Sequence, residues 1–389
     1  MQYSKQNMKL CPFTRLFSSS SDVSFIRPLL DDGYKPAVIS HEEGEEIPIL
    51  LYLPGFDGTL LAPFLQFPEL NTILDVVGMN IKMNDRSSFE SLQKKVIEKM
   101  IELSSLNDNR PIYLMGESFG GILASSVALQ VQDKYSEKIN LKGLTLINPA
   151  TSYLSSKLAE LGPPVSKLPA LLYPLGILIQ LVPLFVDQYQ LPQLMMILQS
   201  KALPSVIDSA DREAYMGRVA LSLSQRLEFM PQETLKWRLE EWLTVGCRQL
   251  QVRQQQSEHE YEEPLSKLSK SLRTLVIVGE DDKTLPSLDE ARRLVNIIPN
   301  SSMFVVEGAG HANTCGSRVD LAALLRGQFD ELQTNNKDRA QQNRIEMKEE
   351  ARKGKGIYFG MEQRYDGNTK IGMLPTRYWD KDVYKEYKI

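Results

Sequence analysis

The segment that most constrains this chain is residues 116–121, Gly-Glu-Ser-Phe-Gly-Gly. An apolar run, residues 111–115, precedes it, and a helix-forming run, residues 122–130, follows it. The glycines on either side of the serine allow a turn that is too tight for a Cβ atom. Such a turn presents the Ser118 hydroxyl at the N-terminus of a helix, where backbone N–H groups and the helix dipole favour negative charge. The alternative is an ordinary glycine-rich turn, because G-x-S-x-G by itself occurs in many chains.

The composition is that of a folded globular protein. Of the 389 residues, 42% are hydrophobic and 24% are charged. The net charge of −4 gives no indication of a nucleic-acid surface. Cys11, Cys247 and Cys315 are scattered and odd in number, which predicts free thiols in a reducing compartment rather than disulfides or a metal site. No motif calls for a cofactor.

Residues 1–45 are expected to form an N-terminal tail. The first twenty-one residues lack Asp and Glu, carry three basic residues and end in four serines. This composition is typical of an organelle transit peptide, and equally of a disordered tail. The cytoplasm is the expected location if the segment is not a transit peptide. Residues 22–46 are polar and are expected to wrap the edge of the fold.

Strand and helix patterns alternate in two parts of the chain, residues 46–150 and 266–332. Short apolar runs predict strands, and segments with helical periodicity predict helices. The predicted strands are residues 47–53, 76–81, 111–115, 141–147, 273–278 and 302–306, and the predicted helices are residues 87–106, 122–130, 288–297 and 319–332. This alternation predicts a mainly parallel sheet covered by helices.

Residues 151–265, between these parts, are expected to form a helical cap. Residues 168–186 carry no charge and have the length of a membrane span, but Pro169, Pro174 and Pro183 argue against one continuous span. We expect short helices, with one face packed in the cap and one face lining a substrate channel or touching a bilayer. Further along the cap, residues 232–250 predict a helix, and the polar residues 249–263 predict an exposed segment.

Residues 333–389 form a C-terminal tail that is first polar and then aromatic. Seven aromatic residues lie within residues 356–389. A segment of this composition is not expected to be wholly disordered. It is expected to dock on the domain, on a partner or on a further domain.

A serine hydroxyl becomes a strong nucleophile only when a base accepts its proton, and the base needs an acid that orients it. The chain holds three histidines. His41 precedes the first predicted sheet strand, and His259 lies in the polar segment of the cap. His311 follows the last predicted strand, behind two glycines. Elimination and position therefore predict His311 as the base.

The acid is expected after the preceding strand, at Asp281 or Asp282. Adjacent side chains point in different directions, so at most one of them faces His311. Asp282 fits the pattern G-x-x-D with a proline four residues later, and Asp281 is the reserve. The chain order Ser118, Asp282, His311 is that of the α/β-hydrolases. The sequence therefore predicts an α/β-hydrolase fold, with the helical cap inserted after the strand at residues 141–147.

Two backbone N–H groups are expected to form an oxyanion hole. In α/β-hydrolases one donor comes from the loop after an early strand and the other from the residue after the nucleophile, which here are Phe56 and Phe119. Ser118 would attack an acyl carbonyl with His311 as base, and each oxyanion donor is worth about 3 kcal/mol in the transition state. Water or an alcohol would then resolve the acyl-enzyme.

Several segments together resemble the phytyl ester synthase family, the esterase/lipase/thioesterase-type acyltransferases of plastids. They are residues 53–59 (Leu-Pro-Gly-Phe-Asp-Gly-Thr), 116–121, 148–152 (Asn-Pro-Ala-Thr-Ser), 233–237 (Glu-Thr-Leu-Lys-Trp) and 285–287 (Leu-Pro-Ser). The resemblance spans residues 45–330. It implies acyl transfer to a lipid alcohol such as phytol or diacylglycerol, from an acyl ester or acyl thioester donor. It also implies a plastid setting with lipid bodies.

The chain departs from this family in one respect. Typical members continue into a second domain, similar to diacylglycerol acyltransferases, that carries a histidine and an acidic residue spaced as H-x4-D. No aspartate stands five residues after any of the three histidines here. Ester hydrolysis is therefore expected beside synthesis.

Two other functions compete with this one. A small-ester or thioester hydrolase would use the same fold and the same residues, whereas a C–C hydrolase or haloperoxidase fits the charge-free cap less well. A lipid-binding scaffold without catalysis would use the cap and the aromatic tail, but it leaves the serine, aspartate and histidine without a role.

Overall fold

A computed structural model of the chain describes residues 22–28, 47–71, 73–105, 109–186, 229–251, 254–257, 260–306, 308–314, 319 and 321–332, with four short strands between residues 359 and 377. The N-terminal segment predicted as a transit peptide or a disordered tail lies outside the described residues, as do His41, His259 and most of the aromatic tail. Cys247 is a buried free thiol, and the other two cysteines are outside the described part.

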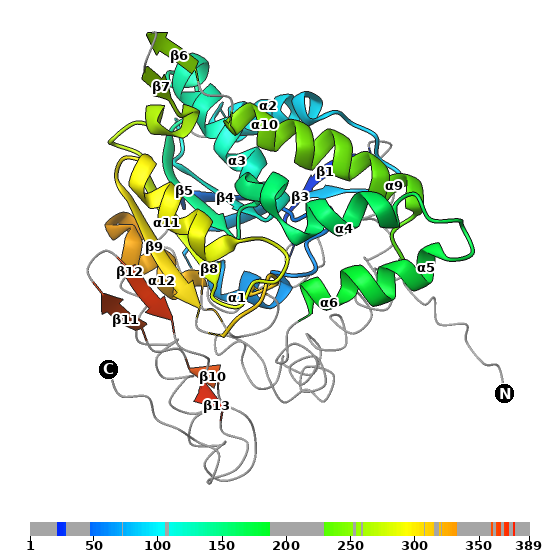
Figure 1. Cartoon of the computed structure of the whole chain (residues 1–389). Helices are drawn as coiled ribbons and strands as arrows, with labels where there is room; N and C mark the ends of the chain where they lie inside the picture. Colours follow the sequence, from blue (N-terminus) through cyan, green and yellow to red (C-terminus); the bar gives the residue numbers. More distant parts are fainter. Residues whose placement is uncertain are drawn as a thin grey trace, which may run out of the picture.

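A nine-stranded sheet runs through the described part of the molecule in the order β1-β3-β2-β4-β5-β8-β9-β12-β11 (Figure 1). Seven adjacent strands are parallel, and β1 and β11 each add an antiparallel strand at one edge. The strands are β1 (Val23–Ile26), β2 (Ile49–Leu53), β3 (Asp75–Ile81), β4 (Ile112–Glu117), β5 (Leu141–Ile147), β8 (Arg273–Gly279), β9 (Ser301–Val306), β11 (Gln363–Asp366) and β12 (Thr369–Gly372). Because the parallel strands share one polarity, their carboxyl ends meet at one edge of the sheet.

Helices cover both faces of this sheet. One face packs against α2 (Phe89–Ser105), α3 (Phe119–Gln130) and α11 (Ser287–Ile297), and the other against α1 (Phe67–Leu70) and α12 (Leu321–Gln328). Alternate residues of β2 enter the two different cores, so that Leu51 faces the first and Tyr52 the second. A strand buried on both faces is a nearly continuous apolar run, which is why the sequence predicts these strands well.

The predicted mainly parallel sheet with flanking helices is confirmed. β5 coincides with the predicted strand, and α3 begins three residues earlier than predicted, at Phe119. The polar appearance of residues 22–46 gives no indication of β1, which pairs with β3. In the tail, β12 pairs in parallel with β9 and so extends the sheet.

The described residues of the cap include two helical stretches with α4 (Lys157–Val165) between them (Figure 1). One stretch runs through α9 (Gln232–Trp237), the π-helical η6 (Arg238–Thr244) and α10 (Val245–Gln251), which packs on α3. This agrees with the helix predicted at residues 232–250. The segment predicted only as exposed, residues 249–263, also contains a hairpin of β6 (Gln254–Ser257) and β7 (Glu260–Glu262).

The charge-free segment forms the other stretch, through α5 (Tyr173–Gly176), η5 (Ile177–Leu181) and α6 (Val182–Phe185). Tyr173 and Leu181 are buried in the cap, whereas Ile179 is 64% exposed. The stretch therefore has one packed face and one exposed apolar face. Among the described helices, none combines the length and the hydropathy that a membrane crossing needs.

Candidate active site

Ser118 lies in the sharp turn between β4 and α3. Its φ of 53° and ψ of −113° fall in a region that L-residues rarely adopt. A Cβ atom on Gly116 would lie 2.0 Å from the Gly120 carbonyl oxygen, and one on Gly120 would lie 2.2 Å from the Leu53 carbonyl oxygen. Both positions therefore require glycine, which is the physical reason for the G-x-S-x-G spacing.

Backbone hydrogen bonds hold this turn against the end of β5. The Ser118 N–H donates to the Ile147 carbonyl at 2.8 Å. The Ser118 carbonyl accepts from the N–H of Gly121 at 3.0 Å and from the N–H of Ala150 at 2.9 Å. The strained conformation persists because β4, α3 and the segment after β5 all constrain it.

Ser118, Asp282 and His311 come together at the carboxyl ends of β4, β8 and β9. Nε2 of His311 lies 2.9 Å from the Ser118 Oγ, and Nδ1 lies 2.8 Å from Oδ2 of Asp282. The Ser118 and His311 residues are 6% and 5% exposed. One ring nitrogen therefore faces the serine and the other faces the acid, which is the arrangement that a serine nucleophile needs.

The loop after β8 orients the Asp282 carboxylate. Oδ1 accepts from the N–H groups of Thr284 at 2.8 Å and Leu285 at 3.1 Å, and Oδ2 accepts from the Ser287 hydroxyl at 2.5 Å. The neighbouring Asp281 is exposed, and its N–H donates to the Ala309 carbonyl at 2.8 Å. Of the two adjacent aspartates, Asp282 is the one that contacts His311.

The charges of Asp282 and His311 stabilise each other. Burial by itself raises the pKa of Asp282, but the His311 charge and the hydrogen bonds from His311, Ser287 and Leu285 outweigh it and hold that pKa below its ordinary value. Burial by itself lowers the pKa of His311, but Asp282 and, more weakly, the Glu117 charge outweigh it, so the pKa of His311 is raised. His311 is therefore a stronger base than an isolated histidine.

Asn148 holds the loop that carries the histidine, a role that the sequence analysis missed. Its Nδ2 donates to the His311 carbonyl, and its Oδ1 accepts from the Gly279 N–H at 2.8 Å. Asn148 has a φ of 38°, which asparagine tolerates better than most residues. The sequence feature that could have indicated this role is an asparagine that directly follows a predicted buried strand and precedes Pro149.

A second buried polar cluster surrounds Glu117, the residue before the nucleophile. The Tyr52 and Thr314 hydroxyls both donate to its carboxylate. Burial raises the pKa of Glu117, although these two hydrogen bonds and the His311 charge oppose the shift. No sequence pattern indicates this cluster, because Tyr52 lies in an apolar run that predicts only a strand and Glu117 lies within the glycine-rich turn.

The loop after β2 runs beside the nucleophile. A Cβ atom on Gly55 would lie 3.7 Å from the Ser118 Cβ, and Phe56 is the next residue in this loop. Neither the Phe56 N–H nor the Phe119 N–H has an acceptor among the described residues. The latter belongs to the first residue of α3, so it has no partner within the helix. Both groups are thus free to bind an oxyanion.

The cap closes over this site. The ring of Phe185, at the end of α6, contacts the His311 ring edge-to-face, with centroids 5.6 Å apart. The Thr284 hydroxyl donates to the Leu184 carbonyl at 2.7 Å. The end of the apolar stretch of the cap therefore lies against the His311 ring. It is also hydrogen-bonded to the loop that carries Asp282.

A family model for the alpha/beta hydrolase fold matches residues 48–314. The chain belongs to the α/β-hydrolase family. MenH from S. aureus has a similar structure, with a TM-score of 0.50 and 17% identity, covering 81% of this chain and all of MenH. At that identity the likeness shows the fold alone.

Two curated plant proteins are similar in sequence. "Phytyl ester synthase 1, chloroplastic" of Arabidopsis thaliana is 30% identical over 293 residues, and "Phytyl ester synthase 2, chloroplastic" is 27% identical over 293 residues. These alignments cover 73% and 72% of the chain. The chain spans 37% of the length of each relative. The expected resemblance to this family is confirmed.

Proposed function

We propose that the chain is a serine acyl hydrolase and acyltransferase that acts on lipid esters through an acyl-enzyme on Ser118. The observation that carries the proposal is the pair of hydrogen bonds that link His311 to Ser118 through one ring nitrogen and to Asp282 through the other. The apolar stretch of the cap above His311 supports a lipid acyl group. The similarity to two phytyl ester synthases supports an alcohol such as phytol as one acceptor.

The reaction begins when the Ser118 Oγ attacks the acyl carbonyl carbon and His311 takes the hydroxyl proton. The carbonyl oxygen becomes an oxyanion, which the N–H groups of Phe56 and Phe119 stabilise. His311 then gives the proton to the leaving alcohol or thiol as the tetrahedral intermediate collapses to the acyl-enzyme. In the second half, an incoming hydroxyl gives its proton to His311 and attacks the acyl carbon. The second tetrahedral intermediate then collapses with cleavage of the bond between the acyl carbon and the Ser118 Oγ, and His311 returns the proton to that oxygen.

The identity of the second acceptor decides between hydrolysis and transfer. The nucleophile and the base are almost fully buried, and Phe185 shields the histidine ring. A dry site lowers the local concentration of water and favours an apolar alcohol. We therefore expect transfer to compete with hydrolysis when phytol or diacylglycerol is present.

The protein should be incubated with a galactolipid or an acyl thioester, with and without phytol. We expect phytyl ester to accumulate at the expense of free fatty acid as the phytol concentration rises. Free acid alone, at all phytol concentrations, would contradict transfer and leave a hydrolase. Turnover only of short, water-soluble esters would instead favour a small-ester or thioester hydrolase.

The exposed face of the cap fits contact with a lipid surface. Leu171 is 90% exposed, Leu178 57% and Ile179 64%, in a segment without charges. Burying a side chain of this kind in a membrane interface contributes about 2 kcal/mol. The same stretch carries Phe185 to the active site, so lipid contact would bring the substrate to the cap.

Replacing Leu171 and Ile179 together with Asp should lower binding to uncharged galactolipid vesicles by at least about tenfold, because two apolar contacts are lost. Sedimentation with vesicles measures this, and Lys94→Asp on α2 is the control for a surface charge change. Equal binding by all three proteins would refute the contact.

The plastid is the location that we propose, because both curated relatives are chloroplastic and the N-terminal composition is typical of a transit peptide. A fluorescent fusion of the full chain should accumulate in plastids. A fusion that stays in the cytosol would contradict this.

A further inference from the structure

We propose that Arg238 and Trp242 in the cap are positioning residues that hold the two oxyanion donors at their working separation. The inference rests on the proposed function, since it assumes that Phe56 and Phe119 bind an oxyanion. It adds that the separation of the two N–H donors depends on the cap as well as on the sheet.

Arg238 acts on the loop that contains Phe56. The residue is 0% exposed, and its Nη1 donates to the Phe56 carbonyl at 2.8 Å. Its Nη2 donates to the Lys82 carbonyl, just after β3, at 2.9 Å. One planar guanidinium therefore joins the oxyanion loop to the end of a strand. A hydrogen bond to the Phe56 carbonyl restrains the peptide groups on either side of it, including the direction of the Phe56 N–H.

Glycine in the same loop makes this approach possible. Gly58 has a φ of 73° and would place a Cβ atom 2.8 Å from the Ile81 carbonyl oxygen and 3.1 Å from Nη1 of Arg238. The loop backbone is thus shaped to fit closely around β3 and the guanidinium. Burial lowers the pKa of Arg238 to about 10, although the Asp57 and Asp85 charges oppose the shift, so the group is charged at neutral pH.

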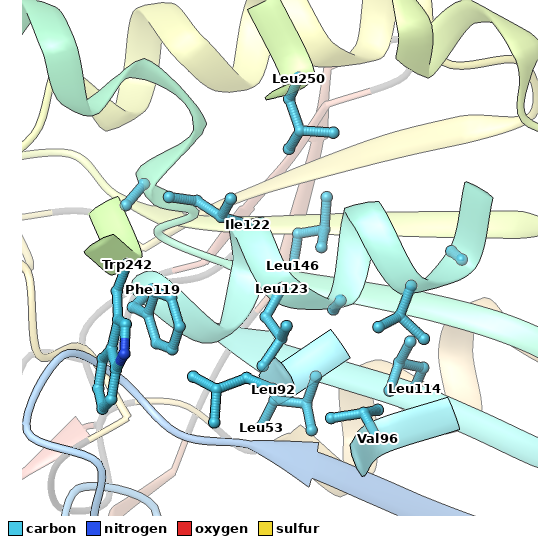
Figure 2. Close-up of a cluster of buried hydrophobic side chains, with 14 of the residues drawn as sticks. Leu53, Leu92, Val96, Leu114, Phe119, Ile122, Leu123, Leu146, Trp242 and Leu250 are labelled. Carbon is cyan, nitrogen blue, oxygen red and sulfur yellow. The ribbon is translucent and has the colours of Figure 1, made fainter. Parts of the chain in front are cut away.

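Trp242 acts on the other donor. Its ring stacks on the ring of Phe119, with centroids 4.7 Å apart and an angle of 20° between the planes. Figure 2 shows the two rings side by side at the start of α3. The indole N–H donates to the Ser87 carbonyl at 3.0 Å, which fixes the ring from its far edge. Phe119 is therefore held between the sheet and the cap.

The two cap residues also hold each other. Arg238 and Trp242 are four residues apart on the same helical stretch, so they lie on one face of it. The Arg238 guanidinium lies 4.3 Å from the centre of the Trp242 ring, a cation–π contact. A continuous chain of contacts thus runs from Phe56 through Arg238 and Trp242 to Phe119. A shift of this cap helix would change the separation of the two donors.

A guanidinium suits this role better than an ammonium group. It is planar and presents several donors in a fixed geometry, so that it reaches two carbonyls and stacks on an indole at once. A lysine in its place reaches one carbonyl at a time and stacks less well. Arg238→Lys therefore distinguishes a positioning role from a requirement for positive charge alone, because it keeps the charge and loses the planar geometry.

The test compares Arg238→Lys, Arg238→Met, Trp242→Phe and Trp242→Leu with the unchanged protein. Steady-state kinetics on a chromogenic acyl ester give kcat and KM, and a trifluoromethyl ketone, which forms an oxyanion on Ser118, reports on the hole. We expect kcat to fall about tenfold in Arg238→Lys and about a hundredfold in Arg238→Met, with KM nearly unchanged. These losses lie at or below the lower end of the roughly 10²–10³-fold cost of deleting a donor outright, because the donor is misplaced and not removed.

The affinity for the trifluoromethyl ketone should fall by the same factor as kcat/KM. Trp242→Phe keeps an aromatic ring against Phe119 and should retain more activity than Trp242→Leu. The control is Arg293→Lys, which alters a partly buried arginine that pairs with Glu263 and Glu290 away from the hole. Circular dichroism shows whether each variant folds. If an Arg238 variant does not fold, Trp242→Phe and Trp242→Leu still test the proposal.

Three results would overturn the inference alone: wild-type kcat in folded Arg238 and Trp242 variants, a loss confined to KM, or a loss of kcat with unchanged affinity for the ketone. A wild-type protein that neither turns over the ester nor binds the ketone would instead refute the proposed function, on which the inference rests.

Discussion

Replacing Ser118 with Ala should lower kcat/KM for ester cleavage by about 10⁵ to 10⁶, because the attacking oxygen is removed and only unassisted attack by water is left. Hydrolysis and acyl transfer should fall together, since both pass through the same acyl-enzyme. A fluorophosphonate probe, which reacts with activated serines, should label the unchanged protein and leave the variant unlabelled. In-gel fluorescence and product analysis measure the two effects.

Ser125→Ala is the matched control for this change. Ser125 lies about two turns further along α3, is fully buried, and its hydroxyl has no partner among the described residues. Its removal should leave labelling and turnover unaffected. If the Ser118 variant is still labelled and active, the nucleophile lies elsewhere. If the unchanged protein is not labelled at all, the non-enzymatic lipid-binding scaffold becomes the better hypothesis.

Replacing Asp282 with Asn should lower kcat by about 10³ to 10⁴, because an amide does not stabilise the charged imidazole or hold the required tautomer. The change should also move the pH profile. In the unchanged protein, activity requires neutral His311, and its raised pKa places the acidic limb above the ordinary histidine value of about 6.5. Without the Asp282 charge, burial dominates and lowers the pKa of His311, so the limb moves to lower pH while the plateau falls.

Asp281→Asn is the control for this prediction, because it makes the same chemical change one residue away at an exposed position. Its pH profile and plateau should match those of the unchanged protein. The assignment would be reversed if Asp281→Asn lost activity while Asp282→Asn kept it. A plateau that falls in Asp282→Asn without a shift of the acidic limb would mean that Asp282 supports the loop but not the charge of His311.

The features that the sequence predicted best depend on local chain geometry. Gly116 and Gly120 each lie two residues from the serine in the chain, and a Cβ atom on Gly116 would lie 2.0 Å from the Gly120 carbonyl oxygen within the same turn. The strands were visible because burial on both faces produces apolar runs. Parallel strands then bring the residues that follow them to one edge, so the order of the motifs was enough to expect Ser118 and His311 near each other.

The features that the sequence missed depend on contacts between distant segments. Arg238 lies in a polar-looking helix, and a charged residue there is normally exposed, but it is fully buried against a loop 182 residues earlier in the chain. β1 joins one edge of the sheet from a segment that looks polar, and β12 joins it from the aromatic tail, where it pairs with both β9 and β11. The Glu117 cluster likewise joins three segments that carry no shared sequence pattern.

The sequence by itself determined the α/β sheet, the elbow and the order of the serine, acid and base, since each of these follows from periodicity, glycine geometry and strand polarity. It also narrowed the candidates for the acid to two adjacent residues, Asp281 and Asp282. Only the tertiary structure decided that Asp282 contacts His311 and that Phe185 covers the histidine. It also showed that Arg238 contacts Phe56 and that Trp242 contacts Phe119. The physical reason is that side-chain direction and cap placement come from packing between segments far apart in the chain, and one-dimensional patterns do not record such packing.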